Sequence, residues 1–466
     1  MPPAVHTRHA TTVSLPSGDG APPLPLPDRH VRLSPFDAHW AALPPVCHVF
    51  LFPAPSPPLP FQDVARAFRS SLATVLPAFH PLAGELAYSP ESRAAVSIVL
   101  AVDARVAFVE AETELEFARL LEEGPEHEQD VVDALRQLVP DIRRDELPAP
   151  VMAAQVTEFV GDGGGVAVGV AVHHAAVDGR GLWRFIEMWA AAATAGVLVQ
   201  QGRVAGEPAP PVHDRSLVRF DGDEEVVAVF LRQLTPDLPR VSHLSKVVAT
   251  QDPSRECRPM LSRRTFTLPA STVRRQKQRL AAATGASSRT PPSTFAALAA
   301  HAWVSLARAS GFTDGAPVFA AFLADCRAHV SPPAPDGYAG NCVAPVMISL
   351  SGEELAGEDG PARAFLAIRE AVEEVRRDPL ADCGRWIAKF DDIPPGRTVV
   401  LVGSPRFPAY AVDFGFGTPA RVEKTSLNHD GEISLLAGRE AGSVQASVVI
   451  SSDKMPAFRE MFGLDV

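Results

Sequence analysis

One region constrains the fold of this 466-residue chain most strongly. It consists of two apolar segments joined by a glycine-rich turn, followed by a segment of helical periodicity. The apolar runs Ala154–Val160 and Val166–Val172 flank the sequence G-D-G-G-G at residues 161–165, a pattern typical of a β-hairpin. Apolar residues then recur at helical spacing from Leu182 to Ala193. We therefore predict a strand-to-helix turn at residues 173–181, the kind of turn that can hold a reactive side chain.

Helix and strand signals alternate along the rest of the chain and predict a mixed α/β fold. Residues 206–262 mix proline, glycine and charge, so we interpret them as a crossover linker between an N-terminal domain, 1–205, and a C-terminal domain, 263–466. The helical segments expected outside the hairpin region are Asp63–Leu76, Glu225–Leu234, a basic helix that contains Arg274, Arg275, Lys277 and Arg279, and the segment opened by Ser293. The expected strands of the second half are Arg264–Leu268, Val318–Leu323, Val399–Val402, Ile433–Ala437 and Val444–Ile450.

The overall charge and the cysteines exclude several classes of protein. With 43 Lys and Arg against 55 Asp and Glu, the net charge of −12 opposes nucleic acid or an anionic membrane as a partner. The five cysteines are scattered without C-x-x-C spacing, which predicts neither a disulfide framework nor a metal site. Because the first residues lack a signal-peptide core and no apolar run is long enough for a bilayer, we expect a cytoplasmic protein.

The predicted turn contains the pattern H-x-x-x-D, with His174 and Asp178, followed by Gly179. A neutral imidazole can remove a proton from a hydroxyl or an amine and return it to a leaving group, as acyl transfer requires. Asp178 could orient His174 or hold the loop by pairing with a distant arginine, and the spacing does not choose between these roles. By itself the pattern is weak, because it is expected by chance about once in such a chain. A zinc site and a serine nucleophile are disfavoured, since further ligand pairs and a G-x-S-x-G motif are missing.

A second segment, D-F-G-F-G at residues 413–417, follows the first motif by about 240 residues. In this order and at this distance, the two motifs resemble the H-x-x-x-D and D-F-G-W-G signatures of the plant BAHD acyltransferases. The resemblance covers most of the chain, and its other matching segments are 80–84, 293–295 with Trp303, 325–327 and 338–342. Within the family, Leu33–Asp37, residues 338–342 and Ser404–Phe407 are similar to the branch that malonylates anthocyanins, flavonoids and other phenolic glucosides.

The resemblance implies an α/β fold of two chloramphenicol-acetyltransferase-like domains with mixed sheets and an interdomain channel. It implies acyl-CoA, most specifically malonyl-CoA, as co-substrate, a phenolic acceptor, a monomer and no bound cofactor or metal. His174 would be the general base, acting without a covalent acyl-enzyme. Asp178 would pair with Arg327 in a structural role. The residues expected to support the site from the second signature are Asp413, Gly415 and Gly417.

Two departures from the family pattern bear on specificity. Phe416 stands where the second signature has tryptophan, which removes an indole N–H donor, and Ala339 stands where phenylalanine is common, which enlarges the space there. Candidate contacts to the donor carboxylate or to CoA are Arg180, Ser293 and Thr294. Two alternatives stay open: transfer from hydroxycinnamoyl-CoA or another acyl-CoA to an alcohol or amine, and a catalytically silent, ligand-binding relative.

Overall fold

The computed structural model describes residues 5–15, 29–56, 58–91, 95–122, 128–161, 164–200, 210–241, 260–285, 291–390, 394 and 396–463. The chain forms two compact units, and each is built from three stretches of sequence. The first unit contains Met1–Ser245, Ser331–Cys342 and Tyr410–Ser426. The second contains Lys246–Val330, Val343–Ala409 and Leu427–Val466.

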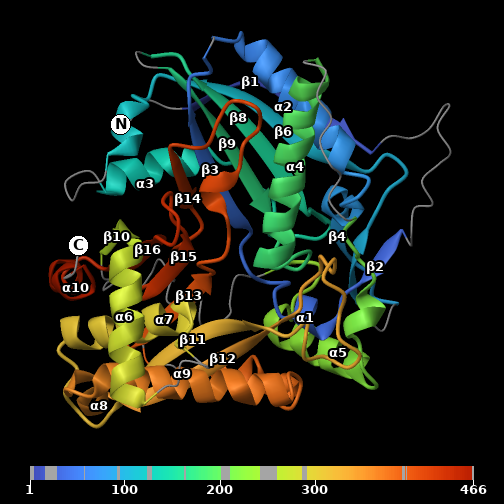
Figure 1. Ribbon diagram of the computed structural model, residues 1–466. Helices are drawn as coiled ribbons and strands as arrows, with labels where there is room; N and C mark the ends of the chain where they lie inside the picture. The colour runs from blue at the N-terminus through green and yellow to red at the C-terminus, as the bar shows by residue number, and fades with distance from the viewer. Residues whose placement is uncertain are drawn as a thin grey trace. The chain divides into compact units, whose positions relative to one another are not determined.

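A six-stranded mixed sheet forms the centre of the first unit (Figure 1). Its order is β1 (Val5–Ser14), β6 (Arg105–Thr113), β8 (Met152–Phe159), β9 (Gly165–Val172), β3 (Val46–Pro53) and β14 (Arg421–Lys424). Neighbouring strands are antiparallel except for the parallel pair β6 and β8. The predicted hairpin is confirmed as β8 and β9, whose register begins with Phe159 opposite Gly165.

Helices cover this sheet and lead into the site. In Figure 1 the green helix α4 (Gly179–Gln200) runs across the sheet, and it packs on α2 (Phe61–Val75). Both helices agree with the predicted periodicity, because their apolar stripes face the sheet. The other helices of this unit are α1 (Pro35–Ala38), α3 (Glu128–Gln137) and α5 (Asp223–Leu234). A smaller sheet has the order β2 (His30–Arg32), β5 (Val96–Val99), β4 (Glu85–Tyr88) and β7 (Ala149–Pro150).

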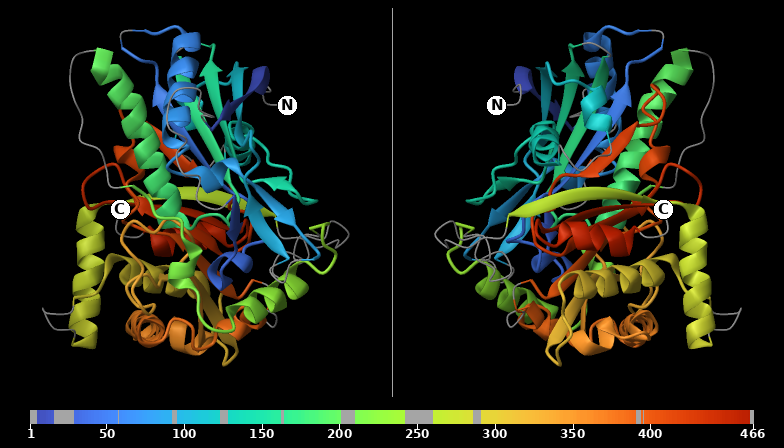
Figure 2. Two further views of the ribbon diagram at one scale, coloured as in Figure 1. Left: turned by 90° about the vertical axis from the view of Figure 1, so that its right-hand side faces the viewer. Right: turned by 90° about the vertical axis from the view of Figure 1, so that its left-hand side faces the viewer.

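The second unit also has a six-stranded mixed sheet, with β10 drawn yellow-green at its edge in Figure 2. Its order is β10 (Leu261–Leu268), β16 (Val444–Ser451), β15 (Glu432–Ala437), β13 (Thr398–Gly403), β11 (Pro317–Asp325) and β12 (Val343–Ser351). Its helices are α6 (Ala270–Thr284), α7 (Thr294–Ala309), α8 (Gly352–Ala356), α9 (Gly360–Arg377) and α10 (Met455–Phe462). The strands predicted for the second half are thus confirmed.

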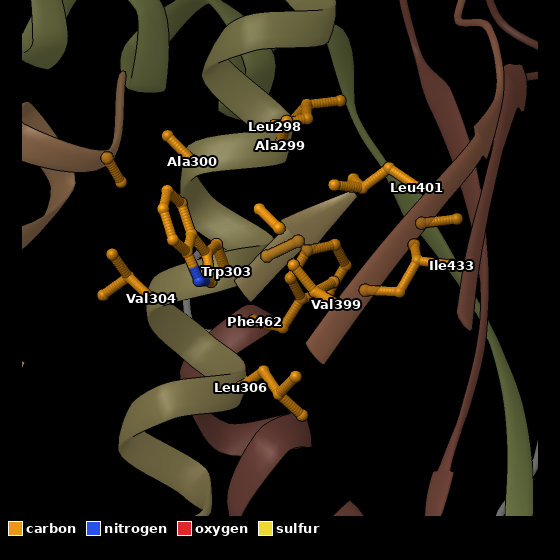
Figure 3. Close-up of a cluster of buried hydrophobic side chains, with 14 of the residues drawn as sticks. Leu298, Ala299, Ala300, Trp303, Val304, Leu306, Val399, Leu401, Ile433 and Phe462 are labelled. Carbon is orange, nitrogen blue, oxygen red and sulfur yellow. The ribbon is translucent and has the colours of Figure 1, made fainter. Parts of the chain in front are cut away.

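Helix α7 is the centre of the core of the second unit (Figure 3). Trp303 is fully buried, and this helix also contacts α6, α8, α9 and α10. Figure 3 shows Leu306 on the side of the helix that faces Val399 of β13, and Trp303 on the side of Ala300 and Val304. The apolar stripe of this segment therefore forms core, as we expected from its spacing.

The division into units differs from the domain limits drawn from the sequence. The predicted boundary at 205/206 lies outside the described residues. Residues 210–241, which we assigned to a linker, contain α5 and belong to the first unit. The D-F-G-F-G segment, which we placed in a C-terminal domain, also belongs to the first unit, because β14 extends its sheet by pairing antiparallel with β3. The α/β fold with mixed sheets is confirmed; the channel expected from the resemblance stays a prediction.

Candidate active site

His174 lies on the turn between β9 and α4, as predicted. The neighbouring His173 is buried, and its Nδ1 accepts a hydrogen bond from the Ala175 N–H at 3.2 Å, so its ring has a structural function. The imidazole of His174 is partly exposed, and its Nδ1 atom is the buried side of the ring. Nε2 is therefore the ring nitrogen that can face a substrate.

The pKa of His174 is lowered from 6.5 to about 4. The largest cause is burial, which disfavours the charged imidazolium. The carboxylate of Asp178 opposes this shift, and the charge of Lys424 on β14 adds to it. The ring is thus neutral at pH 7, which is the form that accepts a proton.

Asp178 caps helix α4 and ties its first turn to a distant segment of the chain. One oxygen, Oδ1, accepts the N–H of Gly181 at 3.0 Å, and Oδ2 accepts the N–H of Cys342 at 3.0 Å. The carboxylate is buried, so both contacts are shielded from water. A side chain on Gly181 would collide with this segment, since its Cβ would lie 2.2 Å from the Ala339 carbonyl oxygen. These contacts support a structural role for Asp178.

Asn341 connects the same segment to the His174 turn and to helix α1. Its Nδ2 donates to the His174 carbonyl at 2.9 Å and to Oδ1 of Asp37 at 2.9 Å. Oδ2 of Asp37 accepts from the N–H and the hydroxyl of Ser34, which forms a capping box at the start of α1. One buried carboxylate thereby joins segments that lie about 300 residues apart.

Arg215 completes this network from the region that we had taken as linker. Its Nε lies 3.4 Å from Oδ2 of Asp37, and both side chains are almost fully buried, with exposed fractions of 3% and 0%. Its Nη2 donates to the Ala176 carbonyl at 2.5 Å, and its Nη1 donates to the His213 carbonyl at 3.1 Å. Asn341 and Arg215 thus hold two carbonyls of the turn that carries His174.

The D-F-G-F-G loop packs on helices α2 and α4. Oδ1 of Asp413 accepts the N–H groups of Gly415 at 2.7 Å and Gly417 at 3.0 Å, and both glycines have positive φ near 95°. The Asp413 carbonyl accepts from Thr194 of α4 at 2.8 Å. Phe416 lies 5.7 Å from the ring of Phe68. These contacts hold the loop in place, which fits the supporting role expected of Asp413, Gly415 and Gly417.

The structure gives the other predicted residues local contacts. Nη1 of Arg327 pairs with Asp325 at 3.2 Å in the second unit, and its expected pairing with Asp178 stays a prediction.

Arg180 is exposed and lies 3.6 Å from the carboxylate of Asp336. Ser293 is the N-cap of α7, where its hydroxyl accepts the Ala296 N–H at 3.1 Å, and Thr294 is the first residue of that helix. The donor contacts proposed for Arg180, Ser293 and Thr294 stay predictions.

Comparison with known proteins identifies the family of this chain. Residues 21–465 match the profile of the Transferase family, which is the family of the BAHD enzymes. The chain is a BAHD acyltransferase. It is 28% identical over 440 residues to phenolic glucoside malonyltransferase 1 of Arabidopsis thaliana, with 90% of each chain covered. It is 26% identical to the malonyl-coenzyme:anthocyanin 5-O-glucoside-6'''-O-malonyltransferase of Salvia splendens, with 97% of this chain and 95% of the relative covered.

Solved structures show the same fold for this BAHD acyltransferase. Vinorine synthase superposes with a TM-score of 0.70 at 17% identity and covers 99% of this chain and 98% of its own. F. graminearum TRI101, complexed with coenzyme A and T-2 mycotoxin, gives a TM-score of 0.65 at 16% identity, over 92% of this chain and 96% of its own. The chloramphenicol-acetyltransferase-like fold class is confirmed.

Sequence reasoning missed the role of three residues in the candidate site. Asp37 and Asn341 lie in segments that we used only for the family resemblance and its branch, and Arg215 lies in the segment that we assigned to a linker. The pattern H-D-R-S at 213–216 offered no periodicity that would reveal a buried arginine. Burial and pairing of a charged side chain depend on residues brought together only by the fold.

The described residues contain no helix long and apolar enough to cross a bilayer. Within that same part of the chain, His, Cys, Asp and Glu side chains do not gather in groups of three or more that could hold a metal ion.

Replacement of Asp178 by asparagine is expected to lower the free energy of unfolding by about 1–2 kcal/mol, because the amide NH₂ cannot accept one of the two backbone N–H groups. Urea unfolding followed by tryptophan fluorescence measures this change. A matched control is Asp103→Asn, since Asp103 is 71% exposed in a surface ion pair and its loss should change little. Unchanged stability with a slower reaction would contradict the structural role and make Asp178 an orienter of His174.

Proposed function

We propose that this acyltransferase transfers a malonyl group from malonyl-CoA to a hydroxyl of a phenolic or flavonoid glucoside, with His174 as general base. The observation that carries the proposal is a neutral histidine, with its pKa lowered to about 4, on a turn whose backbone is fixed by buried side chains. The malonyl donor and glucoside acceptor are supported by the relatives named as malonyltransferases, which align over most of the chain.

The proposed reaction is a direct transfer. Nε2 of His174 removes the proton from the acceptor hydroxyl, whose oxygen attacks the thioester carbonyl carbon. A new C–O bond forms, and the carbonyl oxygen becomes an oxyanion in the tetrahedral intermediate. The intermediate collapses by breaking the C–S bond, and the imidazolium of His174 returns the proton to the CoA sulfur. Because the acceptor attacks the thioester itself, the reaction needs no covalent acyl-enzyme.

The buried environment of His174 suits both halves of this cycle. A base with a low pKa stays neutral at pH 7 and is ready to accept the proton. Once protonated, it is a strong acid in a site that disfavours its charge, so it gives the proton readily to the leaving thiolate. The proposal thus assigns one histidine to both proton transfers.

Arg180 is the residue that we propose for recognition of the malonyl carboxylate. Its side chain is 44% exposed, and its Nη2 lies 3.6 Å from the carboxylate and 3.5 Å from the backbone carbonyl of the fully exposed Asp336. Exposed ion pairs of this kind contribute little to stability, so Arg180 can exchange Asp336 for the carboxylate of the donor at a small cost in free energy. Arg180 also stands at the second residue of α4, next to the His174 turn in sequence.

A second candidate is transfer of a hydroxycinnamoyl group to an alcohol or an amine. It is favoured by the 25% identity to agmatine coumaroyltransferase of Arabidopsis thaliana over 93% of this chain. The buried network around His174 would support either reaction, because it holds the turn that carries the base and makes no contact that selects the acyl donor.

Release of free CoA thiol from malonyl-, acetyl- and coumaroyl-CoA, each with a mixture of phenolic glucosides and with agmatine, tests the proposal. We expect rapid release with malonyl-CoA and a glucoside, together with an acylated product in the mass spectrum. Arg180→Gln should raise KM for malonyl-CoA and leave that for acetyl-CoA unchanged. Release with coumaroyl-CoA alone would replace malonyl transfer by the second candidate, and silence with every pair would favour the ligand-binding relative.

A further inference from the structure

The indole of Trp40 covers one face of the His174 imidazole. The two ring centroids lie 3.9 Å apart and the ring planes differ by 15°, which is a parallel stack. Trp40 has an exposed fraction of 9%, so the face that it covers is closed to water. The ring of His39 also contacts Trp40, with the ring centroids 4.1 Å apart and the ring planes tilted by 43°.

The position of Trp40 is fixed by the network that holds the His174 turn. Trp40 follows helix α1, and its N–H donates to the Asp37 carbonyl at 3.1 Å. The Asp37 carboxylate binds Asn341, whose amide also binds the His174 carbonyl. Asp37 therefore connects the two rings: its carbonyl binds the backbone of Trp40, and its carboxylate binds the Asn341 amide that holds the backbone of His174.

We propose that Trp40 is a positioning residue for His174, because its indole fixes the plane of the imidazole and excludes water from one face. This inference rests on the proposed function, in which His174 is the base. Rotation of the imidazole about its Cβ–Cγ bond would require the ring to leave the stack. The indole therefore keeps Nε2 in one direction during both proton transfers.

The stack also contributes to the burial that keeps the base neutral. The charged or titratable groups around the imidazole are Asp178 at the start of α4, Lys424 on β14, and the side chains of His39 and His173. Burial lowers the pKa values of the two neighbouring histidines to about 3 and about 4, so they stay neutral at pH 7. Opening one face of His174 to water should therefore raise its pKa from about 4 toward 6.5.

A clean test is possible because the indole N–H of Trp40 makes no hydrogen bond with the described residues. Trp40→Phe thus removes no hydrogen bond and keeps an aromatic face, whereas Trp40→Leu keeps apolar volume without a ring. The two variants separate stacking on His174 from simple filling of space. Trp303→Phe is a matched control, since Trp303 is buried in the second unit and its indole N–H also makes no hydrogen bond with the described residues.

The test measures kcat/KM for malonyl-CoA and an aryl β-glucoside from pH 3 to pH 9, a range that includes the wild-type pKa of about 4. We expect Trp40→Leu to lose about 3- to 30-fold in kcat at pH 8, where His174 is neutral in every variant. The acidic limb of the pH–rate profile of Trp40→Leu should also move to higher pH. His174 accepts a proton only above its pKa, and we expect the variant to raise that pKa. Trp40→Phe should restore most of the rate and the original limb.

An unchanged rate and acidic limb in folded Trp40→Leu would overturn the inference, and so would equal losses in the two variants. If Trp40→Leu does not fold, the fluorescence of the wild-type protein decides. Acid quenching between pH 6 and pH 3 that disappears in His174→Gln supports the stack, because a protonated imidazole in contact with indole quenches its fluorescence. Identical quenching in both proteins overturns it. Full activity in His174→Ala would instead refute the proposed function.

Discussion

Replacement of His174 by alanine is expected to lower kcat for malonyl transfer by about 10²- to 10⁴-fold, the contribution of a positioned general base. The proton of the acceptor hydroxyl would then have to pass to water without a fixed acceptor. KM for malonyl-CoA should change little, because the imidazole makes its main contribution in the transition state. Thiol release at saturating donor and acceptor measures the loss.

The matched control for this variant is His9→Ala on the edge strand β1. His9 is exposed and lies far along the sheet order from β9, so its loss should leave the rate unchanged. His174→Ala should unfold at nearly the same urea concentration as the wild type, since the turn is held by backbone contacts and by side chains other than the imidazole. A folded His174→Ala enzyme with undiminished turnover would exclude the histidine as base.

Replacement of Arg215 by methionine is expected to lower the free energy of unfolding of the first unit by about 3–5 kcal/mol, because it leaves the fully buried Asp37 carboxylate without its cation. Activity should fall with it, since the Ala176 carbonyl on the His174 turn loses its donor. Arg215→Lys keeps the charge but not the forked geometry, so it should recover part of the stability and little of the rate. Urea unfolding and thiol release measure the two effects.

Arg66→Met is the matched control for the loss of a surface ion pair. Arg66 pairs with Asp63 on α2, where their exposed fractions are 68% and 50%, and its removal should cost less than about 1 kcal/mol. A double variant, Asp37→Asn with Arg215→Met, should be less destabilised than the sum of the two single variants, because no buried charge is left unpaired. Additive losses, or an Arg215→Met protein as stable as the Arg66→Met control, would show that the pair does not stabilise the unit.

The sequence located the turn that carries His174 correctly because the necessary signals are local. Alternating apolar runs predict β8 and β9, helical spacing predicts α4, and the turn between them contains His174. The same applies to Ser293, whose hydroxyl caps α7 where the apolar periodicity begins. The N-cap bond of Asp178 is equally local, but its second bond, to Cys342, spans 164 residues and has no sequence signal.

The sequence by itself thus determined the secondary structure, the mixed α/β class and the two motifs that resemble the BAHD signatures. Only the tertiary structure decided that residues 331–342 and 410–426 join the first unit, and that Asp37, Arg215 and Asn341 meet behind the His174 turn. The physical reason is that helices and hairpins follow from side-chain periodicity over a few residues. A strand such as β14 joins a sheet through backbone hydrogen bonds that almost any sequence can make, and a buried ion pair depends on charges that are distant along the chain.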